Sequence, residues 1–347
     1  MYRVSAILIV LLIFAVPARA APSRMGELST LESVQKWMYG YRAKPDPARL
    51  PEALRTLNQL GALKDPETSG IYVGFLAGVI GAAPAKADEL LAKLFPVPPA
   101  EQWLIVRAIA YSGHPQWKHL MLKYAASMPA RKVMIEKYLA RELATLNEVP
   151  LEHPAPDLMA KLRGYFSFGG HNKPPGKNLT FENNPELLDT LWGYYFASGA
   201  YGPILRVVSV LPWSKDRDSV DKLNVGSMAK YTLSMYAMRD PGLLELLKSE
   251  LTHQPKEVVA VLKEVIEGAD TADIGRIRKE ALAAVEELKR KGPGYKRDIS
   301  FWGQVGEGAI SLGCVAAAAL GQIEFGIPCV LGGAATSAAV RYWSSPQ

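Results

Sequence analysis

The apolar residues of this chain recur at helical spacing, and proline or glycine interrupts that pattern about every 12–20 residues. Such a pattern buries its hydrophobic residues only when short amphipathic helices pack against one another. The alternation of apolar and polar residues that is typical of strands is missing, as are the Asn-Gly and Asp-Gly turns of β-hairpins. The sequence therefore predicts an all-α fold.

Short turns between the helices determine how we expect them to stack. The segments 112–115, 198–203 and 239–242 each place glycine and proline between two amphipathic stretches, which makes the neighbouring helices antiparallel. Because no strict repeat period is present, we expect irregular stacked antiparallel helical hairpins, similar to an α-solenoid or a bundle. The expected helices cover about residues 29–42, 46–60, 65–79, 85–95, 99–112, 115–128, 130–145, 185–198, 203–211, 217–238, 241–252, 256–267 and 271–291.

A stretch rich in proline and glycine divides the helical pattern in two. Residues 148–182 have the composition of a long surface loop around one short helix, and such stretches are typical of domain boundaries. We therefore expect an N-terminal helical lobe over residues 25–147, a linker over 148–182 and a C-terminal helical lobe over 183–292.

Residues 1–20 have the composition of a secretory signal peptide. Arg3 precedes an apolar run from Ala6 to Val16, and Ala18 and Ala20 form a small-x-small cleavage site. The run has about 11 residues, whereas a permanent membrane span needs ~20. We expect cleavage after Ala20 and export to the periplasm or cell envelope, with an uncleaved anchor helix as the alternative.

Charge and cysteine content restrict the functional classes. The chain has 40 lysines and arginines against 34 acidic residues, and its net charge of +6 is too small to indicate nucleic acid as a partner. Its two cysteines, Cys314 and Cys329, are too few for a disulfide-stapled scaffold. A tight C-terminal hairpin would keep the two thiols apart, and a disulfide between them requires the first arm of that hairpin to end early.

Three apolar strings resemble segments of a group of exported proteins. They are residues 74–79 (GFLAGV), 107–113 (RAIAYSG) and 188–199 (LDTLWGYYFASG). They look like segments of exported α-helical proteins of Gram-negative bacteria that have no assigned function, and the resemblance covers roughly residues 45–265. Because these are packing motifs, the resemblance implies a fold and a compartment and implies no catalytic residue.

The motifs of common enzyme classes are missing from the sequence. There is no Walker loop, Gly-x-Ser-x-Gly elbow or dinucleotide fingerprint, and the five histidines form no His-Glu-x-x-His pair. We therefore expect no cofactor and no metal site, with His114 and His119 as solvated turn residues. Residues Ser227 to Lys230 match Ser-x-x-Lys, in which the lysine takes the proton of the serine, but the partner motifs of that chemistry are absent.

The densest aromatic cluster lies between residues 192 and 201. Leu188, Trp192 and Phe196 are spaced by four residues and share one helix face, as core packing requires. The alternative is an aromatic-lined groove for a peptide or a glycan, because Tyr194 points to another face and is a candidate for exposure. The candidate binding residues of such a groove are Trp192, Tyr194, Tyr195 and Tyr201.

The C-terminal segment 301–343 differs from the rest of the chain by its glycine and alanine content. A polar break at Glu324 separates two apolar arms, which predicts a hydrophobic helical hairpin. Small residues recur at intervals of four along the first arm, an arrangement that lets two helices approach closely. These small residues are Ala309, Gly313, Ala317 and Gly321.

Two interpretations of this hairpin stay open. Trp302 and Trp343 flank it, and aromatic residues at one level are typical of a hairpin that enters a membrane from one surface. Glu324 and a second arm of only about 14 residues oppose full insertion. The alternative is a hairpin buried against the helical lobes or against a second copy of the chain.

These features favour a non-enzymatic scaffold of the cell envelope that binds a protein or peptide partner. The second hypothesis is a membrane-tethered or membrane-acting protein that uses residues 303–341. The third and least favoured is a hydrolase of envelope polymers with Ser227 as its nucleophile.

Overall fold

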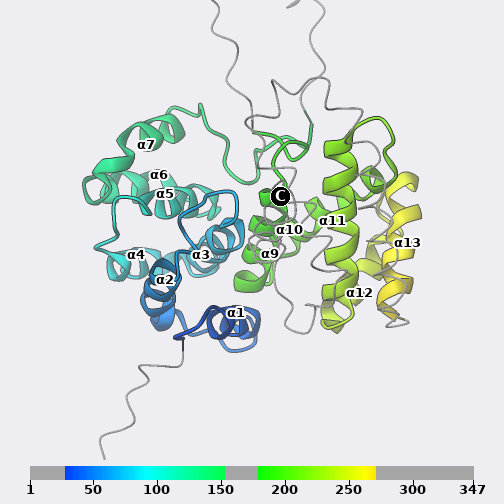
Figure 1. Ribbon diagram of the computed structural model, residues 1–347, viewed down its shortest axis with the longest axis horizontal. Coiled ribbons are helices and arrows are strands. Elements are labelled where there is room, and N and C mark those ends of the chain that lie inside the picture. Colours follow the sequence, from blue (N-terminus) through cyan, green and yellow to red (C-terminus); the bar gives the residue numbers. More distant parts are fainter. Residues whose placement is uncertain (1–27, 153–178, 271–347) are drawn as a thin grey trace, which may run out of the picture.

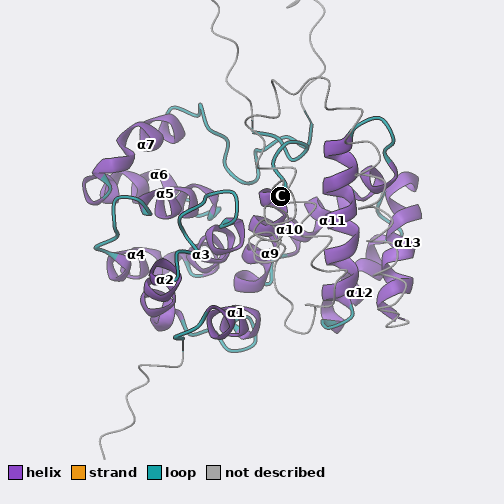
Figure 2. Cartoon of the chain, viewed as in Figure 1, coloured by secondary structure: helices purple, strands orange, loops and turns teal. Residues whose placement is uncertain are grey.

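The structure is a computed structural model of the chain that describes residues 28–152 and 179–270. All regular secondary structure within these ranges is helical and no strand occurs in them (Figure 2), which confirms the prediction of an all-α fold. The α-helices are α1 (Leu31–Gly40), α2 (Leu50–Gln59), α3 (Gly70–Ala82), α4 (Ala87–Leu94), α5 (Gln102–Tyr111), α6 (Trp117–Tyr124), α7 (Lys132–Leu139), α9 (Glu186–Ser198), α10 (Tyr201–Ser209), α11 (Val220–Ala237), α12 (Pro241–Glu250) and α13 (Lys256–Asp270). Single turns of 3-10 helix are η1 (Pro47–Arg49), η2 (Pro84–Lys86), η3 (Ala125–Ser127), η4 (Pro129–Arg131) and η5 (Leu211–Lys215).

Several predicted features lie outside the described residues. They are the signal peptide at 1–20, most of the linker, the predicted helix at 271–291 and the hydrophobic hairpin at 301–343. The hairpin residues Trp302, Ala309, Gly313, Ala317, Gly321, Glu324 and Trp343 and the cysteines Cys314 and Cys329 therefore also lie outside them.

The helix positions follow the sequence prediction closely, and two differences have local causes. The start of α3 lies after the predicted position near residue 65, because Asp65 accepts a backbone hydrogen bond within the preceding turn at 2.9 Å and Ser69 Oγ donates to the Asp65 carbonyl at 2.6 Å. The end of α7 lies before the predicted position near residue 145, because Arg141 adopts a left-handed conformation with φ of 62°.

The helices share one continuous hydrophobic core. In Figure 1, α2 to α7 lie on one side, α11 to α13 lie on the other, and α9 and α10 lie between them. The core includes buried side chains from both predicted lobes. The packing of α3 against α9 is the most extensive contact between any two described elements, and it joins the chain before the linker to the chain after it.

The α3–α9 contact depends on glycine. Gly70, Gly74 and Gly78 recur every four residues along α3, and Gly193 faces them from α9. A Cβ atom placed on Gly74 would lie 1.8 Å from the Thr190 carbonyl oxygen, and one on Gly193 would lie 2.1 Å from the Ile71 carbonyl oxygen. The two backbones therefore touch directly, which fixes the distance and rotation of α9 relative to α3.

The interior position of α3 accounts for its apolar composition. Every residue of α3 from Gly70 to Ile80 is buried, and the helix packs on α9 and α5. Among the described residues no single helix is long and apolar enough to cross a membrane. The helix α3 meets that criterion only in combination with residues 84–94, from which it is bent by 100°.

The two ends of the predicted linker are tied to each other and to α10. The Phe181 amide donates to the Pro150 carbonyl at 3.1 Å, and the Glu182 amide donates to the Leu151 carbonyl at 3.0 Å. The Arg206 guanidinium of α10 lies 4.7 Å from the centre of the Phe181 ring. It also donates hydrogen bonds to the carbonyls of Leu146 and Val149. These backbone contacts hold the two linker ends together.

Substitution of Gly74 by alanine tests the α3–α9 contact. Because the added methyl group would overlap the backbone of α9, we expect Gly74→Ala to lower the free energy of unfolding by about 3 kcal/mol or more. Gly202→Ala in α10 is the matched control, since a Cβ there meets nothing within 4 Å. Urea unfolding should show a control variant within about 1 kcal/mol of the wild type. A Gly74→Ala variant of unchanged stability would contradict the packing described.

Candidate functional site

The structure separates the predicted aromatic cluster into three environments. Trp192 is 1% exposed, and its indole N–H donates to Thr232 Oγ1 at 3.0 Å. Its ring stacks on that of Phe196 at 5.9 Å between centroids. Trp192 is therefore a core residue, as the helix-face spacing predicted, and it presents no surface to a ligand.

Tyr194 and Tyr201 point away from Trp192. The Tyr194 hydroxyl donates to the Ser112 carbonyl at 2.8 Å, so this ring is half-buried between helices. Tyr194, the candidate for exposure, is thus only partly exposed, because its hydroxyl is bonded to the turn after α5. Tyr201 is 54% exposed at the start of α10. Of the four candidates, Tyr195 alone lines a cavity that the structure describes.

That cavity is a groove of about 640 Å³. It lies between α1 and the neighbouring ends of α9, α11 and α12. One wall is the face of α1 that carries Glu32, Gln35, Lys36 and Tyr39. The opposite wall is formed by the end of α9, the end of α11 and the start of α12, which contribute Tyr195, Phe196, Tyr236, Arg239, Asp240 and Pro241. We call this cavity the α1 groove.

Aromatic rings form the floor of the α1 groove. The Tyr39 ring lies 4.7 Å from the Phe196 ring, and the Phe196 ring lies 5.1 Å from the Tyr236 ring in an edge-to-face arrangement. The Tyr39 and Tyr236 hydroxyls are 3.0 Å apart and share a hydrogen bond. These contacts hold the rings in fixed positions.

A charged cluster forms part of the lining of the α1 groove. Arg42 Nη2 lies 2.6 Å from Asp240 Oδ2, and the Tyr195 hydroxyl donates to the same oxygen at 2.8 Å. The Arg42 guanidinium also lies 4.7 Å from the centre of the Tyr195 ring. The other Asp240 oxygen accepts the Leu243 amide at 3.2 Å and caps α12. This cluster links the end of α1 to the start of α12.

The charge states of this cluster follow from its contacts. Burial would raise the pKa of the Asp240 carboxyl, but the hydrogen bonds from Tyr195 and Arg42 outweigh it and hold that pKa below its ordinary value. Burial raises the pKa of Tyr195 to about 12, with its hydrogen bond to Asp240 contributing. Asp240 is therefore ionised and already neutralised by Arg42 before any ligand enters the groove.

A second carboxyl group, near the opposite end of α9, is buried without such neutralisation. Asp189, in the first turn of α9, is 5% exposed, and no hydrogen bond or ion pair to its carboxyl group occurs within residues 28–152 and 179–270. Burial, and then the charge of Glu186, raise its pKa from 3.8 to about 7. Its field reaches Tyr39 on α1 and Tyr72 on α3. Acids with strongly raised pKa values are concentrated at functional sites.

The sequence gives one indication that Asp189 is unusual, but it does not show that the side chain is buried. Asp189 and Thr190 stand in an otherwise apolar run from Leu187 to Trp192, whereas a first-turn acid is usually explained by the helix dipole. Only the structure reveals that Asp189 faces inward. Gln35 was missed for the same reason, since a polar residue in α1 gives no indication that its side chain is buried.

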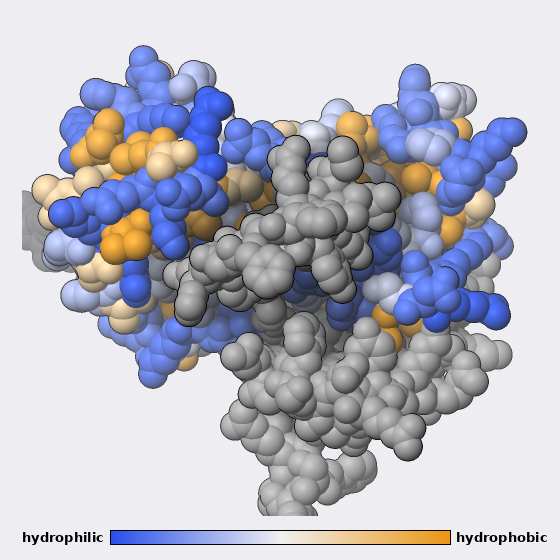
Figure 3. Space-filling view, turned by 90° about the horizontal axis from the view of Figure 1, so that it is seen from above, coloured by the Kyte–Doolittle hydropathy of each residue, from blue (hydrophilic) through white to orange (hydrophobic). Residues whose placement is uncertain are grey.

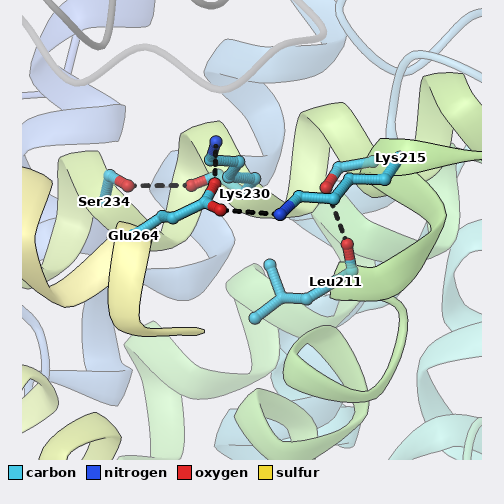
Figure 4. Close-up of polar contacts among 6 residues, drawn as sticks. Leu211, Lys215, Lys230, Ser234 and Glu264 are labelled. Carbon is cyan, nitrogen blue, oxygen red and sulfur yellow. Dashed lines mark hydrogen bonds and ion pairs between the residues drawn. The ribbon is translucent and has the colours of Figure 1, made fainter. Parts of the chain in front are cut away.

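The Ser-x-x-Lys sequence lies in α11, and its lysine is occupied elsewhere. Lys230 Nζ lies 2.8 Å from Glu264 Oε2, and Lys215 Nζ lies 2.7 Å from the other Glu264 oxygen (Figure 4). Burial would raise the pKa of Glu264, but the hydrogen bonds from the two lysines outweigh it and lower that pKa. The Lys230 ammonium group is thus directed to Glu264 on α13. This arrangement favours a structural role for Lys230.

His114 is buried, so the expectation of a solvated turn residue was wrong. Its Nδ1 accepts the Gln116 amide at 3.0 Å, which leaves Nε2 as the donor to the Pro84 carbonyl at 3.1 Å. Both ring nitrogens are thus used to fix the turn between α5 and α6. The described residues contain no group of three or more histidine, cysteine, aspartate or glutamate side chains that could hold a metal ion.

Few large hydrophobic side chains are exposed in the described part of the chain. In the view of Figure 3, hydrophilic residues predominate and the hydrophobic ones gather in separate patches. The large hydrophobic side chains exposed in the described part of the chain are Leu60, Leu122, Val133 and Tyr201, and they come from different elements. Comparison of the chain with models of protein families, with curated proteins and with solved structures found no match. Among the described residues, the α1 groove is therefore the candidate functional site on its geometry alone.

The stability of the protein should depend on pH through Asp189. The folded state holds a proton that the unfolded state releases, so the free energy of unfolding should fall as the pH rises from about 4 to about 7. Asp189→Asn removes the titrating carboxyl group and with it this part of the pH dependence of stability. We expect the variant to be more stable than the wild type by about 2–4 kcal/mol at pH 8 and nearly unchanged at pH 4, as measured by urea unfolding.

The other titratable groups near Asp189 do not imitate this effect. Burial raises the pKa of Tyr39 and of Tyr72, so neither phenol ionises below pH 8. Glu186 is present in the wild type and in the Asp189→Asn variant, so its own titration contributes to both stability curves. Asp218→Asn, at an exposed position, is the control that should leave the pH dependence unchanged. Equal pH dependence in the Asp189→Asn variant and the wild type would contradict the assignment.

Proposed function

We propose that this protein is an exported, non-catalytic interaction protein of the cell envelope that binds a short peptide segment of a partner protein in the α1 groove. The observation that carries the proposal is the groove itself, a cavity of about 640 Å³ with an aromatic floor and charged walls. Sites for specific ligands in proteins commonly have volumes of about 300–1,000 Å³ and combine aromatic lining with a few polar groups.

The length of the groove suits a few peptide residues. Glu32 and Tyr39 lie seven positions apart on α1, which corresponds to about 10 Å along the helix. An extended peptide advances about 3.3 Å per residue, so this wall spans about three of its residues. An acid, an amide, a base and a phenol follow one another along it, namely Glu32, Gln35, Lys36 and Tyr39. Such a wall complements a peptide with charges of both signs.

The arrangement of the rings favours a peptide over a glycan. A glycan binds to aromatic residues through exposed flat ring faces. Tyr195 and Phe196 are 2% and 7% exposed, and edge-to-face contacts cover the faces of the floor rings. Apart from Pro241, the exposed residues that line the groove are instead charged, and charged side chains bind peptide carbonyls, amides and side chains of opposite charge. They are Glu32, Lys36, Arg42 and Arg239.

A groove-blocking variant tests this proposal. A phage-displayed pentapeptide library is selected on the purified protein, and the selected pentapeptides are titrated by calorimetry. Lys36 is exposed on the groove wall, so Lys36→Trp should fill the groove without loss of core packing. We expect the variant to weaken pentapeptide binding by about tenfold or more.

The matched control is the same substitution on a distant helix. Lys137 is exposed on α7, which lies on the far side of the molecule from α1 and α12 (Figure 1). Lys137→Trp should bind the pentapeptides as tightly as the wild type does. The proposal fails if selection yields no binding pentapeptide, or if the Lys36→Trp and Lys137→Trp variants bind equally well.

A further inference from the structure

Two cations of the α1 groove lie beside one pair of tyrosines. The Tyr39 hydroxyl of α1 and the Tyr236 hydroxyl of α11 are 3.0 Å apart, so they join the two walls of the groove. Lys36 precedes Tyr39 by three positions in α1, which places the two residues on one face of the helix. Arg239 follows Tyr236 by three positions, and its amide donates to the Tyr236 carbonyl at 3.0 Å, as in a helical turn. Each wall therefore carries a cation one helical turn from the tyrosine pair.

Positive charge exceeds negative charge in the lining of the groove. Lys36, Arg42 and Arg239 carry the positive charges, whereas Glu32 and Asp240 carry the negative ones. Asp240 is bound to Arg42 at 2.6 Å and also caps α12, so its charge is already compensated. Glu32 lies in the first turn of α1, at the other end of that wall from the tyrosine pair. The part of the groove around the tyrosine pair is therefore positively charged.

No described residue neutralises the Lys36 ammonium group. Within residues 28–152 and 179–270 it makes no hydrogen bond or ion pair, although Glu32 stands one turn before it in the same helix. Arg239 belongs to the opposite wall, and its charge acts on the tyrosine pair: burial raises the pKa of Tyr39, and the positive charge of Arg239 opposes part of that rise. Two positive charges on opposite walls of one groove attract an anionic group.

We propose that the α1 groove holds a carboxylate of the bound peptide between Lys36 and Arg239, beside the tyrosine pair. This inference rests on the peptide-binding function proposed above and adds the chemical class of the group that the groove selects. A carboxylate has two oxygens that accept hydrogen bonds, so it can accept from a cation on each wall. An aspartate or glutamate side chain supplies such a group, as does the C-terminus of a chain.

Three forms of one peptide test the carboxylate subsite on the full chain. The tightest-binding selected pentapeptide is synthesised as a C-terminal amide with its acidic side chains, as a C-terminal amide with asparagine or glutamine in their place, and as that neutral sequence with a free C-terminal carboxylate. By calorimetry, the neutral form should bind about tenfold or more weakly than the better of the two carboxylate forms, the ratio expected for one charge-assisted hydrogen bond. The tighter of the two carboxylate forms identifies the source of the carboxylate.

Substitution of the two cations locates the carboxylate in the groove. Lys36→Gln and Arg239→Gln each remove one charge at an exposed position and keep an amide of similar reach. Each should lower the preference for the carboxylate form over the neutral form by about threefold or more and leave binding of the neutral form nearly unchanged. Lys137→Gln, on the distant helix α7, is the matched control and should keep the full preference, because it changes only the net charge of the protein.

The outcomes separate this inference from the proposed function. Equal binding of the neutral form and both carboxylate forms overturns the carboxylate subsite and leaves the groove as a peptide site. A preference that both Lys36→Gln and Arg239→Gln retain, or that Lys137→Gln loses to the same extent, likewise overturns the subsite alone. A selection that yields no binding pentapeptide overturns both proposals.

Discussion

The direct contact between the backbones of α3 and α9 is the constraint on which the rest of the structure depends. Gly70, Gly74 and Gly78 give α3 a face without side chains, and Gly193 gives α9 the matching gap. A helix pair in such close contact can neither slide nor rotate without a clash between main-chain atoms. The pair joins the chain before residue 148 to the chain after residue 182, so it sets the position of every later helix relative to α1.

This constraint places the groups of the candidate site. With one side of α9 held against α3, the first turn of α9 buries Asp189 where its charge raises the pKa of Tyr72 and of Tyr39. Its last turn directs Tyr195 and Phe196 towards α1. The groove residues Tyr195 and Phe196 and the buried acid Asp189 therefore belong to the same helix, whose position the contact with α3 fixes.

The sequence predicted the helices well and the site poorly, and the reason is physical. Helix positions depend on local features such as the Asp240-Pro241 start of α12 and the Gly199 end of α9, which sequence spacing records. The groove brings together residues far apart in the chain: Tyr39 and Tyr236, which share a hydrogen bond, are 197 positions apart. The residue spacing within a single helix does not show which distant helices lie next to each other. The core role of Trp192 followed from its helix face, whereas the burial of Gln35 and Asp189 depended on which helices cover them.

The hydrogen bonds that join the two ends of the linker affect how a change in linker length would alter stability. Arg206 and the paired backbones near Pro150 and Phe181 close the base of the excursion between residues 152 and 179. Once the base of a loop is closed by its own bonds, each doubling of the loop adds only about 0.6 kcal/mol of entropy. A change in the length of the chain between residues 152 and 179 should therefore cost the helical body that carries the groove little free energy.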